Sequence, residues 1–417
     1  MPDVLVIGAG VSGLACAARL AGAGLTPVVL EARDRMGGRV RTHRPADGGP
    51  PLELGAQIIH GVSNPVHALL GPLPPAPRPE TARVISGRTG RPMGLLARGA
   101  NPPWTLEARL AAEQTYDGPV ESWLAATGAD GTERATAREW LRQIWAADPA
   151  HLSTRAVAVA MRRDPAGRGE FTLPNGLDAL PHRMADGLDV RTGHAVTRLT
   201  LEPGRVRAHT GHGVLSAPQA VVTVPPAVLA AGRLEIEGLT PQKRAAATAL
   251  VPGDACCAVV TLDTPAPETA AVFDADGVGG FLGCRRDRPE ILIVAKDTAA
   301  AAVRAALKAP EALRALIAVA LPWAAHAGVS AVETADWGAD PWSGGAFCAP
   351  RTGAGDAAAQ WAAPLGGAVF FAGEATMTGR ALPWIGGALD SGHRAAGEVL
   401  AARSGTPATA TREARTA

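Results

Sequence analysis

The chain has 417 residues, 47% of them hydrophobic, and a formal net charge of +1. This length exceeds one simple hydrophobic core and predicts about two domains. The near-neutral charge predicts no attraction to nucleic acid or to an acidic membrane surface, and no apolar stretch is long enough to span a bilayer. The odd count of five cysteines and the scattered histidines predict neither a disulfide framework nor a metal site.

The N-terminal segment predicts a βαβ unit. Val4–Ile7 is a continuous apolar run, typical of a strand that is buried on both faces of a parallel sheet. The turn Gly8–Gly13 then leads into an Ala- and Leu-rich helix that reaches about Leu20, and a second strand, Pro27–Leu30, is followed by Glu31. Because Met1-Pro2-Asp3 carries no basic or apolar leader, we expect a cytoplasmic protein.

The turn has the Gly-x-Gly-x-x-Gly spacing of dinucleotide-binding folds. Gly8 permits the tight turn, Gly10 lets the backbone approach a pyrophosphate, and Gly13 allows close packing of helix on sheet. The helix N-terminus offers unpaired N–H groups to the phosphates. Glu31, 18 positions after Gly13, is expected to accept hydrogen bonds from the adenosine ribose. Ordinary turn glycines are the alternative, which the strand, helix and acid together disfavour.

The rest of the chain mixes loop, helix and strand patterns. Gly71–Pro103 is rich in Pro, Gly and Arg and predicts a loop or lid, whereas Leu106–Ala147 has a helical pattern. The tail, residues 403–417, is rich in Ala, Thr and Arg and is expected to be disordered. Strands are predicted at Leu188–Leu199, Arg205–His209, Ala220–Val224, Ala258–Leu262, Glu290–Val294 and Ala368–Ala372, and helices at Glu311–Ala320 and Ala388–Ala402.

The segment after the second strand distinguishes between dinucleotides. Its sequence, Leu30-Glu31-Ala32-Arg33-Asp34-Arg35-Met36-Gly37-Gly38-Arg39, resembles the extended FAD signature of the flavin-containing amine oxidases, the group that holds monoamine and polyamine oxidases. A solvated basic face is the alternative for these arginines. The resemblance continues, in order, through Glu53–Gly61, Pro174–Leu177, Ala220–Pro226, Trp337–Phe347, Phe371–Ala375 and Trp384–Gly392.

The resemblance implies an α/β fold in which a Rossmann-type FAD-binding domain is interleaved with an α+β substrate-binding domain. The implied FAD-binding domain is discontinuous and comprises residues 1–65, 166–235 and 345–402. The substrate-binding domain comprises residues 66–165 and 236–344. Non-covalent FAD is expected, because Ala346 stands where monoamine oxidases carry the cysteine that attaches their flavin.

Cofactor contacts follow from the same resemblance. The backbone of Val196 matches the position that pairs with adenine, Glu374 matches the ribitol ligand, and the helix that starts near Ala388 would point its positive end at the flavin N1/O2 edge. The implied cofactor-binding residues are Gly8, Gly10, Gly13, Glu31, Ala32, Arg33, Gly38, Arg39, Gly55, Ala56, Gln57, Ile58, Val196, Gly373, Glu374, Ile385 and Ala388.

Three further positions match residues that carry the chemistry of the family. Phe347 and Trp384 match the two facing aromatic rings that lead an amine to flavin N5, and His60 matches a polar residue at the rim. Core aromatics and a structural histidine are the alternatives. One departure concerns a family lysine near N5. Cys257, four residues after Gly253, occupies its place, and Lys296 at a strand end does not fit the motif.

The resemblance implies oxidation of a C–N bond in a small amine. Hydride transfer to flavin N5 would give an imine, and dioxygen would reoxidise the flavin with release of hydrogen peroxide. The missing lysine argues against dioxygen as the oxidant that regenerates the flavin. It favours one alternative, a flavin-dependent C–C desaturase of the same fold. A second alternative is a non-catalytic superfamily member. Neither the particular amine nor the oligomeric state can be inferred from the sequence.

Overall fold

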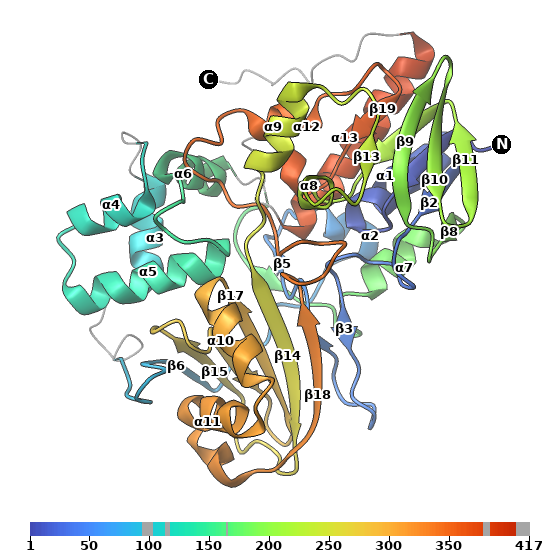
Figure 1. The fold of residues 1–417 in the computed structure, drawn as a ribbon. Coiled ribbons are helices and arrows are strands. Elements are labelled where there is room, and N and C mark those ends of the chain that lie inside the picture. Colours follow the sequence, from blue (N-terminus) through green and yellow to red (C-terminus); the bar gives the residue numbers. More distant parts are fainter. Residues whose placement is uncertain (94–102, 113–116, 164–165, 378–383, 406–417) are drawn as a thin grey trace.

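A five-stranded parallel sheet organises one half of the molecule (Figure 1). The computed structural model describes residues 1–93, 103–112, 117–163, 166–377 and 384–405. The sheet has the order β19-β12-β1-β2-β8, with every neighbouring pair parallel, which confirms the expected α/β class. Its strands come from distant parts of the chain: β1 (Val4–Ile7), β2 (Pro27–Leu30), β8 (Asp189–Arg191), β12 (Gln219–Val222) and β19 (Val369–Phe371).

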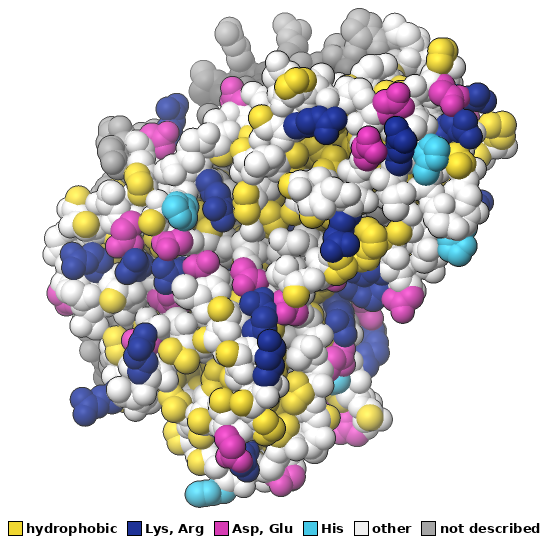
Figure 2. Space-filling model, in the orientation of Figure 1, with side chains coloured by type: hydrophobic (Ala, Val, Ile, Leu, Met, Phe, Trp, Pro, Cys, Tyr) yellow, Lys and Arg dark blue, Asp and Glu magenta, His cyan; other side chains and the backbone are white. Residues whose placement is uncertain are grey.

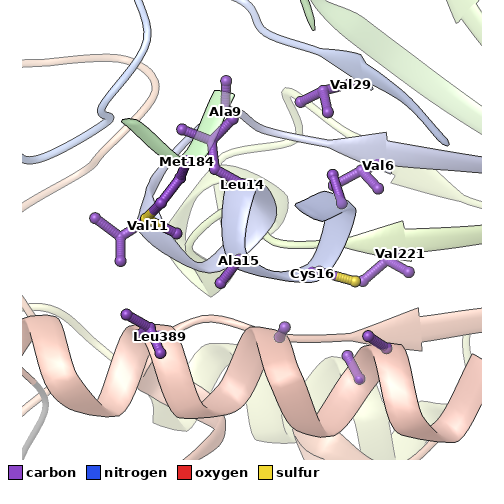
Figure 3. Packing of buried hydrophobic residues seen from close by; sticks show 14 of the residues in the cluster. Val6, Ala9, Val11, Leu14, Ala15, Cys16, Val29, Met184, Val221 and Leu389 are labelled. Atoms are coloured by element: carbon purple, nitrogen blue, oxygen red, sulfur yellow. The ribbon is translucent and has the colours of Figure 1, made fainter. Parts of the chain in front are cut away.

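Both faces of this sheet are covered, which explains the continuous apolar runs of its central strands. On one face the helices α1 (Val11–Gly22) and α13 (Ile385–Ser404) pack against each other, and Figure 3 shows Leu389 of α13 close to α1. Their approach is close, since a Cβ added to Gly392 would lie 2.2 Å from the Ser12 carbonyl oxygen. A four-stranded sheet covers the other face: β9 (Val196–Glu202), β10 (Arg205–Thr210), β11 (Gly213–Ala217) and β13 (Glu235–Ile236).

A six-stranded sheet, in the order β18-β14-β17-β16-β15-β6, builds the other half. One face packs on the helices α10 (Thr298–Ala306) and α11 (Pro310–Ala320), and the opposite face packs on Leu52 and Leu54. The strands are β6 (Thr81–Ile85), β14 (Ala255–Leu262), β15 (Ala270–Asp274), β16 (Phe281–Cys284), β17 (Glu290–Lys296) and β18 (Val329–Asp336). A separate helical cluster comprises α3 (Pro103–Ala112), α4 (Val120–Ala126), α5 (Gly131–Trp145) and α6 (Thr154–Arg163).

Short elements connect these units. The remaining strands are β3 (Thr42–His43), β4 (Leu52–Glu53), β5 (Ile59–His60) and β7 (Glu170–Phe171). The remaining helices are α2 (Val66–Leu70), α7 (Ala179–Ala185), α8 (Pro226–Ala230), α9 (Pro241–Ala249) and α12 (Ala357–Ala362), together with the 3-10 turns η1 (Pro322–His326) and η2 (Glu374–Thr376).

Several predicted boundaries were wrong. The helical pattern of Leu106–Ala147 is divided among α3, α4 and α5, because Pro119 precedes α4 and Asp130 caps a new helix by accepting a hydrogen bond from Glu133 N at 2.8 Å. The predicted loop Gly71–Pro103 contains β6, which forms as a partner of the distant β15. Residues 94–102 of that loop lie outside the described residues.

Two other predictions need correction at element ends. The strand predicted at Leu188–Leu199 is two strands, β8 and β9, which belong to different sheets. Helix α13 begins at Ile385 rather than near Ala388, and it includes the first two residues of the tail expected to be disordered. Residues 406–417 of that tail lie outside the described residues.

The surface carries no charged region of one sign on the face shown in Figure 2, where Lys and Arg alternate with Asp and Glu. All five cysteines are buried and unpaired. Among the described residues, no helix has the length and apolar character to cross a membrane, and no group of His, Cys, Asp and Glu is arranged to bind a metal ion.

Candidate active site

The glycine turn between β1 and α1 has the geometry of an anion cradle. Gly8 has a φ of +108°, and a Cβ added to Gly13 would lie 2.0 Å from the Gly8 carbonyl oxygen, so neither position admits a side chain. At Gly10 the nearest atom to an added Cβ is Gly38 Cα at 4.0 Å, so a side chain there would fill open space rather than collide. Helix α1 begins at this space without a capping side chain or an acid in its first turn. Its N–H groups are therefore free to bind a phosphate.

Glu31 is fixed at the end of β2. Its side chain is only 4% exposed and accepts hydrogen bonds from Ala9 N at 2.8 Å and from Arg33 N at 2.9 Å. Each carboxylate oxygen keeps a lone pair for a further donor such as a ribose hydroxyl. The guanidinium of Arg33 lies 3.7 Å from Glu31 Oε1 and donates to Asp340 at 2.6 Å and to Ser343 at 2.8 Å. Ala32 lies between the two, partly buried.

Arg39 joins three of the predicted binding segments. The turn before it lies against the cradle, because Gly37 N donates to Ala9 O at 2.9 Å and Gly38 lies beside Gly10. The Arg39 guanidinium donates to Ala346 O at 2.6 Å and to Glu374 Oε1 at 2.8 Å. Glu374 is 6% exposed, so this ion pair connects the N-terminal and C-terminal motifs.

The stretch Gly55–Ile58 runs beside the same turn. A Cβ added to Gly55 would lie 2.0 Å from Arg39 O, and Ala56 N donates to that oxygen at 3.0 Å. Gln57 and Ile58 are partly buried. Val196, which opens β9, is buried in the cluster between the parallel sheet and the four-stranded sheet.

Helix α13 offers a second uncapped N-terminus. Its first turn, which includes Ile385 and Ala388, has no capping side chain and no acid. Gly373, which precedes Glu374, has a φ of +117° and donates its N–H to Ser391 Oγ of this helix at 2.9 Å. The C-terminal motif is thereby held against the start of the helix.

His60 and Trp384 lie against each other. Their ring centroids lie 4.0 Å apart with an interplanar angle of 34°. Asn64 holds this segment by donating to His60 O at 2.8 Å. Burial, together with the nearby charge of Lys296, lowers the pKa of His60 to about 4. The imidazole is therefore neutral at physiological pH.

Phe347 is placed by backbone pairing with the segment before β14. Gly253 N donates to Phe347 O at 2.9 Å, and Ala346 N donates to Gly253 O at 2.7 Å. Gly253 admits no side chain, because an added Cβ would lie 1.7 Å from Ala146 O. Pairing between segments far apart in the chain thus fixes the backbone of Phe347.

Lys296 lies near these residues, although in the sequence it stands at a strand end and does not fit the lysine motif of the family. Its Nζ lies 5.7 Å from the centroid of the Phe347 ring, and its charge acts on His60. In the antiparallel pair β14–β17, Ala255 is opposite Lys296 and Cys257 is opposite Val294, so Lys296 and Cys257 project from the same sheet face. Burial lowers the pKa of the Lys296 ammonium to about 8. Only the strand pairing could have identified this residue.

Family comparison matches residues 11–400 to the flavin containing amine oxidoreductase model. The chain belongs to this family. It is 27% identical over 271 residues to polyamine oxidase 2 of Arabidopsis thaliana, which covers 58% of this chain and 54% of the relative. The match therefore spans about half the length of that curated relative.

Solved amine oxidases share the fold. Putrescine oxidase bound to putrescine superposes with a TM-score of 0.79 at 20% identity, covering 96% of this chain and 99% of the other. Cyclohexylamine oxidase from Brevibacterium oxydans IH-35A superposes with a TM-score of 0.78 at 22% identity, covering 97% and 99%. These neighbours have the same two-domain architecture.

The described residues fit the flavin cofactor of the family. The open space at Gly10 before an uncapped α1 suits a pyrophosphate, and the uncapped start of α13 suits the electron-rich edge of a flavin ring. The Glu31 carboxylate has acceptor capacity left for a ribose hydroxyl, and the Glu374 carboxylate beside Arg39 could accept a hydrogen bond from a ribitol hydroxyl. Arg39 also donates to the carbonyl oxygen of Ala346, the residue before Phe347. The residues suited to the flavin are thereby connected to the aromatic side chains.

Proposed function

We propose that this chain is an FAD-dependent oxidase of small amines, with FAD bound non-covalently. The observation that supports the proposal is the placement of Lys296, whose Nζ lies 5.7 Å from the Phe347 ring and whose charge acts on His60, which lies against Trp384. Ala346 and the start of helix α13 connect Phe347 and Trp384 to residues suited to a flavin. The division into FAD-binding and substrate-binding segments and the individual cofactor contacts are part of the same proposal. Ala346 offers no thiol for attachment.

The reaction follows from what the cofactor supplies and what the chain provides. Held by the glycine turn, Glu31, Arg39 and Glu374, FAD would supply the acceptor for a hydride from the carbon next to the amine nitrogen, so that the amine becomes an imine and dioxygen takes up the two electrons as hydrogen peroxide. The amine must react without its extra proton, because only a nitrogen lone pair stabilises the developing cation. Phe347 and Trp384 lower the pKa of a bound ammonium by removing water, and they orient the C–H bond.

His60 contributes as a neutral polar group. With a pKa of about 4 it is uncharged at physiological pH, and its ring offers one N–H donor and one acceptor nitrogen. The stacked Trp384 ring limits its rotation, and the Asn64 bond limits the movement of its backbone. Its role in the proposal is to orient the substrate nitrogen by hydrogen bonding.

The absorbance spectrum of the purified protein tests the proposal. We expect a bound flavin that acid or urea releases intact, and bleaching of its band when a panel of primary and secondary amines is added without oxygen. Admission of air should restore the band and yield one hydrogen peroxide per flavin reduced. A colourless protein, or a flavin that no amine reduces, would contradict the proposal. The desaturase alternative was favoured by a missing lysine, and Lys296 on the same sheet face weakens that argument.

A further inference from the structure

Lys296 is a cation in an apolar, aromatic neighbourhood, and its position is tightly defined. Three hydrogen bonds join it to the fully buried Gln143: Lys296 N donates to Gln143 Oε1 at 2.9 Å, Gln143 Nε2 donates to Lys296 O at 2.9 Å, and Lys296 Nζ donates to Gln143 O at 2.7 Å. The next residue, Asp297, has a left-handed φ of 51° and lies 2.9 Å from the Arg142 guanidinium. Such a strained corner persists only where its surroundings hold it.

No carboxylate compensates this charge. Among the described residues, Lys296 forms no ion pair with Asp or Glu, and Cys257, itself a buried thiol, is the one group whose charge bears on its pKa. Asp297, the next residue, and Glu139, which accepts from Gln143 Nε2, both form ion pairs with Arg142. The Lys296 ammonium has three N–H donors, and its recorded acceptor is Gln143 O. Among the described residues no other acceptor bonds to this ammonium, which leaves two donors for a ligand.

The position of the ammonium links it to the amine-binding residues. It lies beside the Phe347 ring, and its charge acts on His60, which stacks on Trp384. An amine held between the two aromatic residues would therefore have its remaining functional groups within range of this cation. A desolvated cation attracts an anion and repels a second cation more strongly than the same charge in water.

We propose that Lys296 sets the charge class of the substrate, so that the site accepts amines whose second group is anionic or absent and rejects amines with a second ammonium. This inference depends on the proposed amine oxidation and adds a substrate class to it. It separates the chain from a diamine oxidase, because the amine-binding residues include no described carboxylate that could bind the distal ammonium. Lys296 acts here as a specificity-determining residue and takes no part in the hydride transfer.

A series of four-carbon amines with the same reacting end tests the proposal. The series is 4-aminobutanoate, butylamine and butane-1,4-diamine, assayed by anaerobic flavin reduction and by peroxide release. For the wild-type holoprotein we expect kcat/KM to be at least about tenfold lower for the diamine than for butylamine, because two like charges would be brought together in a desolvated site. In Lys296→Met, kcat/KM should rise for the diamine and fall for 4-aminobutanoate by a similar factor. The value for butylamine should change least.

Two controls bracket this variant. Lys296→Arg keeps the charge and should keep the order of the series. Lys308→Met removes an exposed cation just after α10, which packs on the opposite face of the sheet, and should leave all three rates unchanged. If Lys296→Met does not fold, Lys296→Gln replaces it, and a wild-type protein that oxidises the diamine faster than butylamine overturns the proposal without any variant.

Two readouts do not depend on turnover. Butanoate, which lacks the amine, should perturb the flavin absorbance of the wild type and bind Lys296→Met at least about tenfold more weakly. The pKa of His60, followed by NMR, should rise in Lys296→Met because a nearby positive charge has been removed. If butylamine is oxidised and Lys296→Met has the same order of kcat/KM for the three amines as the wild type, this inference alone is wrong. If no amine reduces the flavin, the proposed function itself is wrong.

Discussion

The two ends of the proposed flavin site are built in different ways. The nucleotide end is made of backbone groups and glycines that are close in sequence, and Glu31 there has its acceptors matched by local N–H donors. The amine end collects His60, Lys296, Phe347 and Trp384 from four distant segments. The nucleotide end depends on glycines, which leave room for a ligand, whereas the amine end depends on the chemistry of its side chains. A search for sequence motifs therefore finds the nucleotide end and can miss residues of the amine end.

The two ends also differ in how fully their charges are satisfied. Glu374 is buried but paired with Arg39, whereas Lys296 is desolvated with a single recorded acceptor. A half-buried charge that is largely removed from water and has no ion-pair partner among the described residues costs stability, which a functional role near the aromatic rings would explain. The following predictions test this contrast from the largest expected effect to the smallest.

Gly13→Ala should remove the flavin. The added Cβ would lie 2.0 Å from Gly8 O, so the turn and helix α1 must separate, and we expect FAD affinity to fall by about 100-fold or more. The flavin-to-protein absorbance ratio measures the effect. Gly22→Ala, at the end of the same helix with open space around it, is the matched control and should purify with flavin. A yellow, fully loaded Gly13→Ala protein would show that the cradle is misplaced.

Trp384→Ala should impair oxidation and leave FAD bound. Loss of the ring that stacks on His60 removes orientation and water exclusion, and we expect kcat/KM to fall by about 10- to 100-fold. Phe347→Ala should behave similarly. Trp384→Phe keeps an aromatic face and should recover most of the rate. Stopped-flow flavin reduction gives the measurement, and an unchanged rate in both alanine variants would remove these residues from the site.

Lys296→Met should stabilise the protein, by about 1–2 kcal/mol at pH 7 after allowance for its partial exposure. The folded pKa of about 8 lies below the usual 10.5, so the unfolded chain binds more protons between these values. Wild-type stability should therefore rise from pH 8 to 10.5 relative to the variant, because the destabilising charge is present below pH 8 and lost above it. Urea unfolding at pH 7, 9 and 10.5 checks this. A destabilised variant with no pH-dependent difference would assign Lys296 a structural role.

His60 should have the smallest effect within the physiological range. Its pKa is lowered from 6.5 to about 4, so it stays neutral above pH 5 in the folded protein. The rate of flavin reduction between pH 5 and 7 should show no step that is due to His60. The pH profile of His60→Gln should therefore have the same shape as that of the wild type in this range. Its contribution to stability should decline as the pH falls from 6.5 towards 4, because only the unfolded chain then binds the proton. A rate step near pH 6.5 that depends on His60 would contradict the neutral assignment.

Much of the fold could be predicted from local patterns. The apolar run of β1, the glycine turn and Glu31 predicted the start of the parallel sheet, because a strand buried on both faces has no alternation and a tight turn needs glycine. Segment 106–147 was correctly predicted to be helical, but its division into α3, α4 and α5 was not predicted. Strand β6 was missed, since its short Thr81–Ile85 segment becomes a strand only by pairing with β15.

The sequence by itself determined the α/β class, the family and the nucleotide cradle, because these depend on residues near one another along the chain. Tertiary structure alone decided that Lys296 joins Phe347, His60 and Trp384, since the side of a sheet on which a residue projects depends on strand pairing. It also decided that Arg39 pairs with Glu374 across the site. Electrostatic character follows from what surrounds a charge, and those neighbours come from the whole chain.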